Sequence, residues 1–485
     1  MVVDGSFCSL FTRMLAYDLR PCVMAAGPFH KRALHMDDLF KTLRSSGQDH
    51  LIPVIESLPQ ERQGPFVERL RAIDWQELAA PEVPLDDAAV AQSRVVDRQE
   101  RAQRADEFSA VGERAYQDGA VAVLMVAGGQ GTRLGLDAPK GCFPIGALSG
   151  ASIYQLQAEK VLALSRRIGR AVPLLVMTSP MTDAQTRSFF AEHQRFGLAE
   201  DQLRFFCQGT VPSLDADGRA LLAAPDRLLE NPDGHGGCFT ALVASGQLQR
   251  LVDEGVRRIV YIQVDNILVP VDDPILVGVA EVESADVVTK VLDKAHPDEK
   301  VGHLVRVGER DRIIEYTELT AEQARMRDDD GRLVYRWGSP AMHCWSVSFL
   351  AALAQDGFRP PLHRSAKPLK AWREGAMATV EGWKNERFIF DLIPQARISI
   401  GLEIERDDEF APVKNADSQG SDCPATARRL ASDLFARWLS AQGVVVDLPP
   451  DAHLEISPVF AATVADLAQR WDGRSQRVDG DLLLR

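Results

Sequence analysis

The sequence predicts an α/β protein with a doubly wound, mostly parallel, Rossmann-like sheet, a helical segment before it and a small α+β unit after it. Three apolar runs carry this prediction. Residues 121–126 form a short continuous run, and runs of the same kind follow at 173–177 and 258–264. Uninterrupted runs of this length are typical of strands that are buried on both faces. Helical patterns lie between the runs, and strands that alternate with helices favour a parallel sheet with crossover helices.

The length of the chain predicts more than one domain. A chain of 485 residues is too long for one ordinary hydrophobic core, since domains commonly hold about 100–200 residues. We expect a helical N-terminal segment over residues 1–115, an α/β domain over residues 116–400 and a small C-terminal α+β domain over residues 401–485.

Within these parts, the spacing of apolar side chains predicts the helices in order. Apolar residues recur at helical spacing through most of residues 37–113. In the α/β domain the same spacing predicts helices over 154–168, 183–193 and 237–254. Near the C-terminus a helix is expected to begin around Pro424 and to end at Gly443, and a strand is expected over residues 444–446.

Composition excludes several classes of protein. Lys and Arg number 55 against 69 Asp and Glu, so the net charge is −14 and no basic footprint for nucleic acid or an anionic membrane is present. The seven cysteines are scattered and never spaced as Cys-x-x-Cys, which fits a reducing cytoplasm. No apolar run approaches the roughly 18–20 residues that a membrane helix needs. Charges interrupt residues 1–36, so we expect no secretory signal, and Met24 and Met36 leave the start of translation open.

A glycine-rich loop follows the first predicted strand directly. It reads Ala127-Gly-Gly-Gln-Gly-Thr-Arg-Leu-Gly135. Glycines let backbone N–H groups approach an anion closely, so the loop is suited to phosphate, although a plain strand-to-helix turn would also explain a lone glycine pair. Arg133 in the loop and Lys140 after it add positive charge. Two cations beside a backbone anion site suit a triphosphate whose charge must be spread during phosphoryl transfer.

Single residues exclude three common glycine-loop patterns. Leu134 stands where both the dinucleotide-binding fingerprint and the kinase loop need glycine. Lys140 follows Pro139 and precedes Gly141, so the Gly-Lys-Ser/Thr ending of a Walker A loop is absent. The loop therefore belongs to none of these three classes.

A carboxylate ends the third predicted strand. Asp265 comes directly after the apolar run 258–264. A carboxylate at the carboxyl end of a parallel strand, beside bound phosphates, is a natural anchor for Mg²⁺, although a helix cap or a turn would also use an aspartate there. The sequence offers one such carboxylate, so nucleotide oxygens and waters would supply most of the other ligands.

Four segments, in a consistent order, resemble the eukaryotic-type UDP-sugar pyrophosphorylases, a family of nucleotidyltransferases. They are Leu124-x-x-x-Gly-Gly-x-Gly-Thr-Arg-Leu-Gly-x-x-x-Pro-Lys-Gly141, Val264-Asp-Asn-Ile-Leu-Val269, Glu409-Phe-x-Pro-x-Lys-Asn-Ala-Asp-Ser418 and Glu455-Ile-Ser-Pro458. The resemblance covers about residues 37–458, and within the family the chain is most similar to the UDP-N-acetylglucosamine branch.

The resemblance implies roles on the nucleotide side. The residues expected to contact the nucleotide are Gly128, Gly129, Gly131, Thr132, Gln208, Gly237 and Asp265. Gln208 would hydrogen-bond uracil, since a carboxamide presents both a donor and an acceptor to an imide edge. Gly237 closes a second glycine turn, Gly234-His-Gly-Gly237, beside the base. The expected catalytic cations are Arg133, Lys140 and Lys414, and Asp265 would hold Mg²⁺.

The resemblance also implies a sugar site. It would be formed by Glu315, Ser339, Lys384 and Phe390, with Phe388 as a further wall, although alternating aromatic residues on a strand also occur as plain core. Two positions depart from the N-acetylglucosamine branch. His235 stands where that branch usually has asparagine and UDP-glucose enzymes usually have histidine, and Ser339 replaces an asparagine expected to touch the sugar.

The implied reaction joins UTP and a sugar 1-phosphate to give a UDP-sugar and pyrophosphate. N-acetylglucosamine 1-phosphate is the expected sugar phosphate, and His235 and Ser339 favour the alternative of a UDP-glucose or broad UDP-sugar pyrophosphorylase. A third hypothesis is a silent nucleotide-sugar sensor, which would have lost cations that this chain retains. The nucleophile is already ionised at neutral pH, so no general base is expected. Nucleic acid and membrane are not expected as partners, and the oligomeric state stays open.

Overall fold

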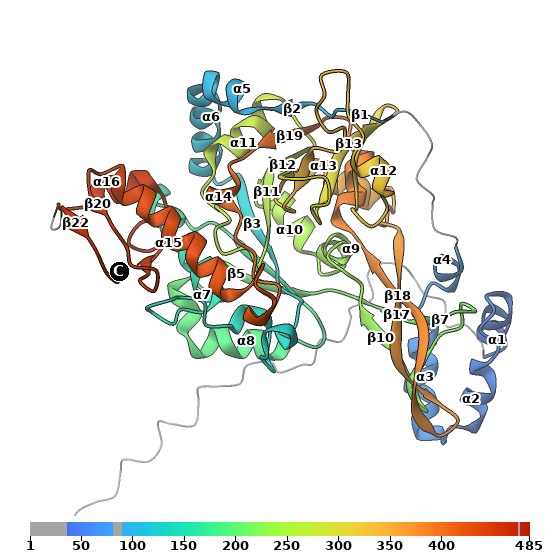
Figure 1. Cartoon of the computed structure of the whole chain (residues 1–485). Coiled ribbons are helices and arrows are strands. Elements are labelled where there is room, and N and C mark those ends of the chain that lie inside the picture. The colour runs from blue at the N-terminus through green and yellow to red at the C-terminus, as the bar shows by residue number, and fades with distance from the viewer. Residues whose placement is uncertain (1–35, 81–89, 474–475) are drawn as a thin grey trace, which may run out of the picture.

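A twelve-stranded sheet lies at the centre of the computed structural model, which describes residues 36–80, 90–473 and 476–485 (Figure 1). Nine of its strands follow the order β1-β13-β15-β12-β16-β11-β3-β4-β5, β14 pairs with β13, and β19 pairs with β12 and β2. Their bounds are β1 Val90–Ala91, β2 Val95–Val96, β3 Val121–Val126, β4 Leu174–Thr178, β5 Leu203–Cys207, β11 Arg258–Gln263, β12 Val287–Asp293, β13 Gly302–Val307, β14 Arg310–Ile314, β15 Trp337–Ser339, β16 His343–Ser346 and β19 Ser399–Glu403.

The strands β5, β4, β3 and β11 form a parallel block. The strands β2, β12, β13 and β19 point the same way, so eight of the twelve described strands share one direction. The chain builds β4 and β5 on one side of β3 and then returns with β11 on the other side. The strand order therefore reverses between β3 and β11, and open α/β sheets bind ligands at such a point. The predicted fold class is confirmed.

Helices cover both faces of the sheet. Along β3, Val121, Val123 and Met125 point into one core and the residues between them point into a second core, because side chains alternate along a strand. The helices of the first face are α6 Ala105–Gln117, α7 Ile153–Ile168, α8 Asp183–Glu192, α11 Pro274–Val282 and α15 Pro424–Ser440. The helices of the second face are α9 Gly237–Ala244, α10 Gln247–Asp253, α13 Val347–Gln355 and the 3₁₀ turn η4 Ile389–Gln395.

Most predicted elements are confirmed within a few residues, and two differ. The helix expected over 237–254 is split into α9 and α10, because Gly246 has a φ of +74° and ends the first of them. The helical prediction for residues 37–113 holds on either side of β1 and β2, which instead add short strands to the central sheet. The expectation of no secretory signal concerns residues 1–36, nearly all of which lie outside the described part of the chain.

Four N-terminal helices pack beside a long hairpin, namely α1 Met36–Ser45, α2 Leu51–Ser57, α3 Gln60–Arg71 and α4 Trp75–Ala79. The next helix, α5 Arg98–Gln103, lies instead against the central sheet, where the Arg98 N–H donates to the Glu403 carboxylate at 3.0 Å. The first four helices share a core with Leu362 and Trp383 of the hairpin β17 Leu362–Arg373 and β18 Ala376–Arg387. Figure 1 shows α1, α2 and α3 beside the part of the hairpin that lies away from the central sheet, and α4 closer to the sheet. Glu374 and Gly375 both have positive φ, as a two-residue hairpin turn requires. Glu77 of α4 forms an ion pair with Arg387 of β18.

The C-terminal unit has its own core but is fastened to the α/β domain. Its predicted helix is confirmed as α15, and Gly443, with a φ of +80°, follows it. The Glu455 carboxylate accepts hydrogen bonds from the backbone N–H groups of Leu148 and Ser149, at 2.7 and 3.0 Å. Leu148 and Ser149 precede α7, so the two units share a hydrogen-bonded contact. The boundaries 115/116 and 400/401 stay a prediction.

The remaining elements are short. They are α12 Ala321–Ala324, α14 Arg406–Glu409, α16 Val464–Arg470, η1 Thr132–Leu134, η2 Lys140–Cys142, η3 Gln194–Gly197, η5 Asp417–Gln419, β6 Thr210–Pro212, β7 Leu214–Asp215, β8 Leu222–Ala224, β9 Arg227–Leu228, β10 Glu230–Pro232, β20 Val445–Val446, β21 Leu454–Ile456, β22 Arg477–Val478 and β23 Leu482–Leu484. Among the described residues, no helix combines the length and apolar character needed to cross a lipid bilayer.

Candidate active site

The two predicted chemical segments lie side by side at the point where the strand order reverses. The glycine loop follows β3, and Asp265 lies two residues after β11. These strands are parallel neighbours, with Val126 opposite Gln263, so both segments emerge at the carboxyl edge of the sheet. This is the position that the sequence predicted for a phosphate site and a metal anchor.

The glycine loop turns back on itself. The Gly131 N–H donates to the Ala138 carbonyl at 2.8 Å, and the Lys140 N–H donates to the Gly129 carbonyl at 3.1 Å. These two bonds place the start of η2 beside the start of the loop. A Cβ on Gly141 would lie 2.3 Å from the buried Tyr154 ring, so only glycine fits where the chain leaves the loop.

A cation and a carboxylate meet across the reversal point. The Lys140 ammonium lies 2.9 Å from the Asp265 carboxylate, and each side chain is 18% exposed. Thr132 and Arg133 lie on the exposed outer side of the loop, and Arg133 has no ion pair among the described residues. The structure therefore joins two of the predicted residues directly and leaves Arg133 open to solvent.

Gln208 lies against the loop with an unused hydrogen-bond acceptor. It follows β5, is 5% exposed, and its Nε2 would lie 2.4 Å from a Cβ on Gly128. Its Oε1 is buried and has no hydrogen-bond partner among the described residues. A buried carboxamide oxygen without a partner is costly unless a ligand supplies the donor. The geometry is that expected of a residue that binds the polar edge of a base.

The second glycine turn packs tightly on a buried carboxylate that the sequence did not single out. A Cβ on Gly237 would lie 1.9 Å from Asp233 Oδ1. Burial raises the pKa of Asp233 to about 6 despite the nearby Arg387 guanidinium. The same turn lies against the end of β18, where the Gly236 N–H donates to the Arg387 carbonyl at 2.8 Å. A Pro-Asp-Gly sequence predicts a turn but gives no sign of this burial.

His235 of that turn is enclosed by aromatic rings. It stacks on Phe388 with ring centroids 5.3 Å apart, and Phe390 lies 5.6 Å away. The Ile389 N–H donates to His235 Nδ1 at 3.2 Å, so Nδ1 is an acceptor and the proton of the neutral ring is on Nε2. Burial lowers the pKa of His235 to about 4. Phe390 is 6% exposed and belongs to the hydrophobic core, which was the alternative to a role in the sugar site.

The remaining predicted sugar-site residues come from three other elements. Glu315 follows β14, and burial together with nearby Glu318 raises the pKa of its carboxyl group, whereas the Lys414 ammonium acts in the opposite direction. Ser339 ends β15 and accepts a bond from the Ala341 N–H at 3.3 Å. Lys384 on β18 forms an ion pair with Glu386 at 2.6 Å. Within the described part of the chain, Lys384 forms no ion pair with Glu315.

Lys414 is held beside Asp265 by the backbone. The Val413 N–H donates to the Asp265 carbonyl at 2.9 Å, which places the next residue, Lys414, at the same edge of the sheet. The Lys414 side chain is exposed, and its ammonium lies 5.8 Å from the centre of the Phe410 ring. Lys140, Asp265 and Lys414 therefore surround the reversal point from three segments that are far apart in sequence.

Asp265, the predicted metal ligand, lies beside the glycine loop. Within the described residues, no group of three or more His, Cys, Asp or Glu side chains could hold a metal ion. One carboxylate beside a phosphate-binding loop fits Mg²⁺, which is usually bound through one or two carboxylates together with substrate phosphates. The donor set does not fit zinc, which takes three or four protein ligands.

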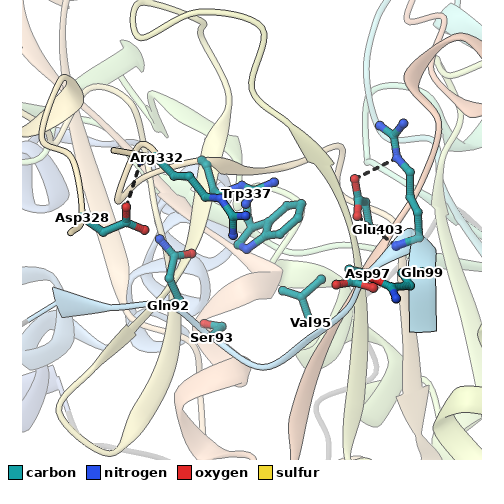
Figure 2. Close-up of a pocket in the computed structure, with 11 residues that line it drawn as sticks. Gln92, Ser93, Val95, Asp97, Gln99, Asp328, Arg332, Trp337 and Glu403 are labelled. Carbon is teal, nitrogen blue, oxygen red and sulfur yellow. Dashed lines mark hydrogen bonds and ion pairs between the residues drawn. The ribbon is translucent and has the colours of Figure 1, made fainter. Parts of the chain in front are cut away.

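A separate cavity of about 450 Å³ lies at another edge of the sheet. Figure 2 shows Trp337 in the middle of the residues that line the cavity, with Gln92 and Arg332 on one side of it and Glu403 on the other. Its charged lining residues are Asp97, Arg98, Asp328, Arg332, Arg336 and Glu403. Guanidinium and carboxylate groups are equal in number, so the cavity has no excess positive charge for phosphate. None of the predicted site residues lines it.

The fold and the site define a nucleotide-binding α/β protein of the nucleotidyltransferase class. The model of the UTP–glucose-1-phosphate uridylyltransferase family matches residues 71–436. The chain belongs to this family, whose reaction class is uridylyl transfer, and enzymes of this class generally use a divalent metal ion.

Several relatives are similar over most of their length. An Arabidopsis thaliana UDP-N-acetylglucosamine diphosphorylase 2 is 37% identical over 75% of this chain and 76% of its own. A human UDP-N-acetylhexosamine pyrophosphorylase-like protein 1 is 33% identical over 90% of this chain and 95% of its own. The crystal structure of the UDP-N-acetylglucosamine pyrophosphorylase from Trypanosoma brucei is 29% identical, with a TM-score of 0.75 over 93% of this chain and 99% of that one.

Proposed function

We propose that the protein transfers the uridylyl group of UTP to N-acetylglucosamine 1-phosphate and releases pyrophosphate. The observation that carries the reaction is the position of Lys140 and Asp265, 2.9 Å apart beside the glycine loop at the reversal point of the sheet. The identity of the sugar is supported by the relatives, which are named for UDP-N-acetylglucosamine or UDP-N-acetylhexosamine.

In the proposed reaction, an oxygen of the sugar phosphate attacks the α-phosphorus of UTP. The bond between the α-phosphorus and the bridging oxygen breaks, and pyrophosphate leaves with that oxygen. One phosphoanhydride is exchanged for another, so the barrier lies in bringing two anions together and in stabilising the leaving charge. Lys140 and Lys414 approach this point from different segments and would supply the positive charge. Arg133, exposed on the loop, would close over the phosphates.

We propose Mg²⁺ as the metal and Asp265 as its protein ligand. When bound, the metal would neutralise phosphate charge and orient the α-phosphate. Lys140 contacts Asp265 Oδ2, so Oδ1 would be available to the metal while the Lys140 ammonium lies beside the phosphates. Gln208 would recognise uracil, and Gly128, Gly129 and Gly131 would admit the nucleotide close to the backbone.

The sugar side of the proposal uses the second glycine turn. Glu315 would accept hydrogen bonds from sugar hydroxyls, and Lys384 would contact the sugar phosphate. His235 Nε2, whose ring is fixed by the Ile389 N–H, would present a donor beside the Phe388 wall. Ser339 would contact the sugar more weakly than the longer carboxamide of asparagine.

The test is pyrophosphate release from UTP with a panel of sugar 1-phosphates, namely those of N-acetylglucosamine, N-acetylgalactosamine, glucose and galactose. We expect the highest kcat/KM with N-acetylglucosamine 1-phosphate, and no release without Mg²⁺. A higher value with glucose 1-phosphate would support the second candidate, a UDP-glucose or broad UDP-sugar pyrophosphorylase, which His235 and Ser339 favour. Release with none of the four sugars would refute the enzymatic proposal.

A cytoplasmic location is also proposed. Among the described residues no disulfide joins the cysteines, which agrees with a reducing compartment.

A further inference from the structure

Asn266, the residue after the proposed metal ligand, forms hydrogen bonds inside the protein with both the nitrogen and the oxygen of its carboxamide. It is 2% exposed. Its Nδ2 donates to the Glu409 carbonyl at 2.7 Å and contacts Met342 Sδ at 3.7 Å. Its Oδ1 accepts from the backbone N–H groups of Ala411 at 2.9 Å and Leu268 at 3.3 Å. A buried amide with both ends satisfied fixes the segments that it joins.

The bonds of Asn266 form one end of a ladder that leads to Lys414. The Ile267 N–H donates to the Ala411 carbonyl at 3.3 Å, and the Val413 N–H donates to the Asp265 carbonyl at 2.9 Å. Asn266 and Pro412 lie opposite each other as an antiparallel bridge. The residues immediately before Lys414 are thus fastened to the residues on either side of Asn266.

A buried ion cluster holds the far end of the same segment. Glu409 and Asp273 both form ion pairs with Lys290, which is 1% exposed on β12. Asp273 also caps α11 by accepting from the Leu276 N–H at 2.9 Å. The segment 409–413 is therefore anchored at Glu409 by charge and along its length by Asn266 and its neighbours.

We propose that Asn266 is a positioning residue for Lys414, and that its amide holds the Lys414 backbone at a fixed place beside Asp265. This inference rests on the proposed function of Lys414 as a cation of the reaction. Lys414 itself is exposed, with no ion pair among the described residues, so its place depends on the backbone that carries it. Loss of the Asn266 amide should let the ammonium drift from the reacting phosphates.

A double-mutant cycle tests the inference, with kcat of pyrophosphate release as the readout. We expect Lys414→Ala to lower kcat about 100-fold and Asn266→Ala to lower it about tenfold, with KM for UTP changed by less than about threefold. If Asn266 acts through Lys414, adding Asn266→Ala to Lys414→Ala should lower kcat by less than about twofold. A full tenfold further loss would overturn the inference.

Gln202→Ala is the matched control. Gln202 is 5% exposed, its Nε2 donates to the Val172 carbonyl at 2.9 Å, and its Oε1 accepts from the Ala199 N–H at 3.3 Å. It lies just before β5, at the opposite edge of the sheet from the site. We expect Gln202→Ala to lower the thermal stability and to leave kcat within about twofold in both backgrounds. An equal loss of kcat in Gln202→Ala and Asn266→Ala would reduce Asn266 to a structural role and overturn the inference.

If Asn266→Ala does not fold, Glu409→Gln can replace it in the same double-mutant cycle. It keeps the size of the side chain and removes the charge that pairs with Lys290, and its effect on kcat should likewise vanish in the Lys414→Ala background. Persistence of that effect would contradict the inference. If Lys414→Ala alone leaves kcat unchanged while the wild-type enzyme is active, the proposed role of Lys414 fails and this inference falls with it. An inactive wild-type protein would instead refute the proposed function.

Discussion

Lys140 of the glycine loop and Asp265 after β11 form an ion pair of 2.9 Å across the gap between two parallel strands. The pair joins the residue expected to stabilise phosphate charge to the residue expected to anchor the metal. The two charges neutralise each other in the structure. The Asp265 carboxylate also holds the Lys140 ammonium beside the glycine loop, where the proposed reaction needs it.

Replacement of Lys140 should impair turnover more than folding. We expect Lys140→Ala to lower kcat on the order of 100-fold or more, because a cation that acts on charge developing in the transition state is lost. Steady-state pyrophosphate release measures this effect. The control is Lys370→Ala, which removes an exposed lysine of the hairpin strand β17. Wild-type turnover in Lys140→Ala would refute the assigned role.

Replacement of Gln208 should weaken nucleotide binding without lowering the stability of the fold. Its Oε1 is buried without a partner among the described residues, so Gln208→Leu removes an uncompensated desolvation cost and should not lower Tm. The same change removes the expected contact with uracil and should raise KM for UTP about tenfold or more. Thermal unfolding and KM for UTP test the two halves separately. A lower Tm with an unchanged KM would mean that Gln208 is a structural residue.

Gly141 should tolerate no side chain. A Cβ there would lie 2.3 Å from the buried Tyr154 ring, so Gly141→Ala should lower the free energy of unfolding by about 1–3 kcal/mol. Gly64 is an exposed residue inside α3, and a Cβ there would meet no atom within 4 Å apart from its chain neighbours. Gly64→Ala should change the free energy of unfolding by less than about 1 kcal/mol, because the higher helix propensity of alanine is offset by the steric cost of a Cβ before Pro65. Urea unfolding compares the two variants. Equal stability in both would contradict the close contact at Tyr154.

His235 should make the protein sensitive to acid. Burial lowers its pKa to about 4 in the folded state, against 6.5 for an ordinary histidine. The unfolded chain therefore binds more protons between pH 6.5 and pH 4, and stability falls as the pH falls through this window. We expect wild type to lose on the order of 1–2 kcal/mol more than His235→Asn between pH 7 and pH 5.

Urea unfolding at the two pH values measures this difference, and the exposed His193 supplies the control variant His193→Asn. Buried His303 and His343 act in the same direction, with pKa values lowered to about 4 and about 3. Asp233 acts in the opposite direction, because its pKa is raised to about 6. These groups are common to wild type and His235→Asn, so the difference between the two reports His235. Parallel pH profiles for the two proteins would contradict the burial of its neutral ring.

The sequence predicted the parts of the fold that depend on neighbouring residues. The apolar run of β3 coincides with the strand at both ends, since a strand buried on both faces has no polar positions. The sequence also predicted that the glycine loop and Asp265 lie at one edge of the sheet, because the carboxyl ends of parallel strands lie at the same edge. The long hairpin β17–β18 was not predicted, because half of the residues in its two strands are polar and its turn, Glu374-Gly375, is a weak signal.

Contacts between distant segments could not be predicted in the same way. The spacing of Lys140 and Asp265 along the chain says nothing of a 2.9 Å ion pair, and Lys384 pairs with Glu386 on its own strand. The burial of Asp233 depends on the end of β18, which lies about 150 residues further along the chain. Such burial has no local pattern, so only the folded chain reveals it.

The hydrogen bonds of Glu455 have a practical consequence for engineering. The carboxylate binds the turn that leads into α7, and that helix in turn holds the residues after Asp265 through Lys160, whose ammonium donates to the Ile267 carbonyl at 2.7 Å. A shortened chain that stops before residue 455 would lack the carboxylate that accepts the hydrogen bonds of that turn. The turn and α7 would then hold the residues after Asp265 less firmly. Any truncated variant of the enzyme should therefore keep residues 455–485, and a C-terminal fusion partner should be attached after them.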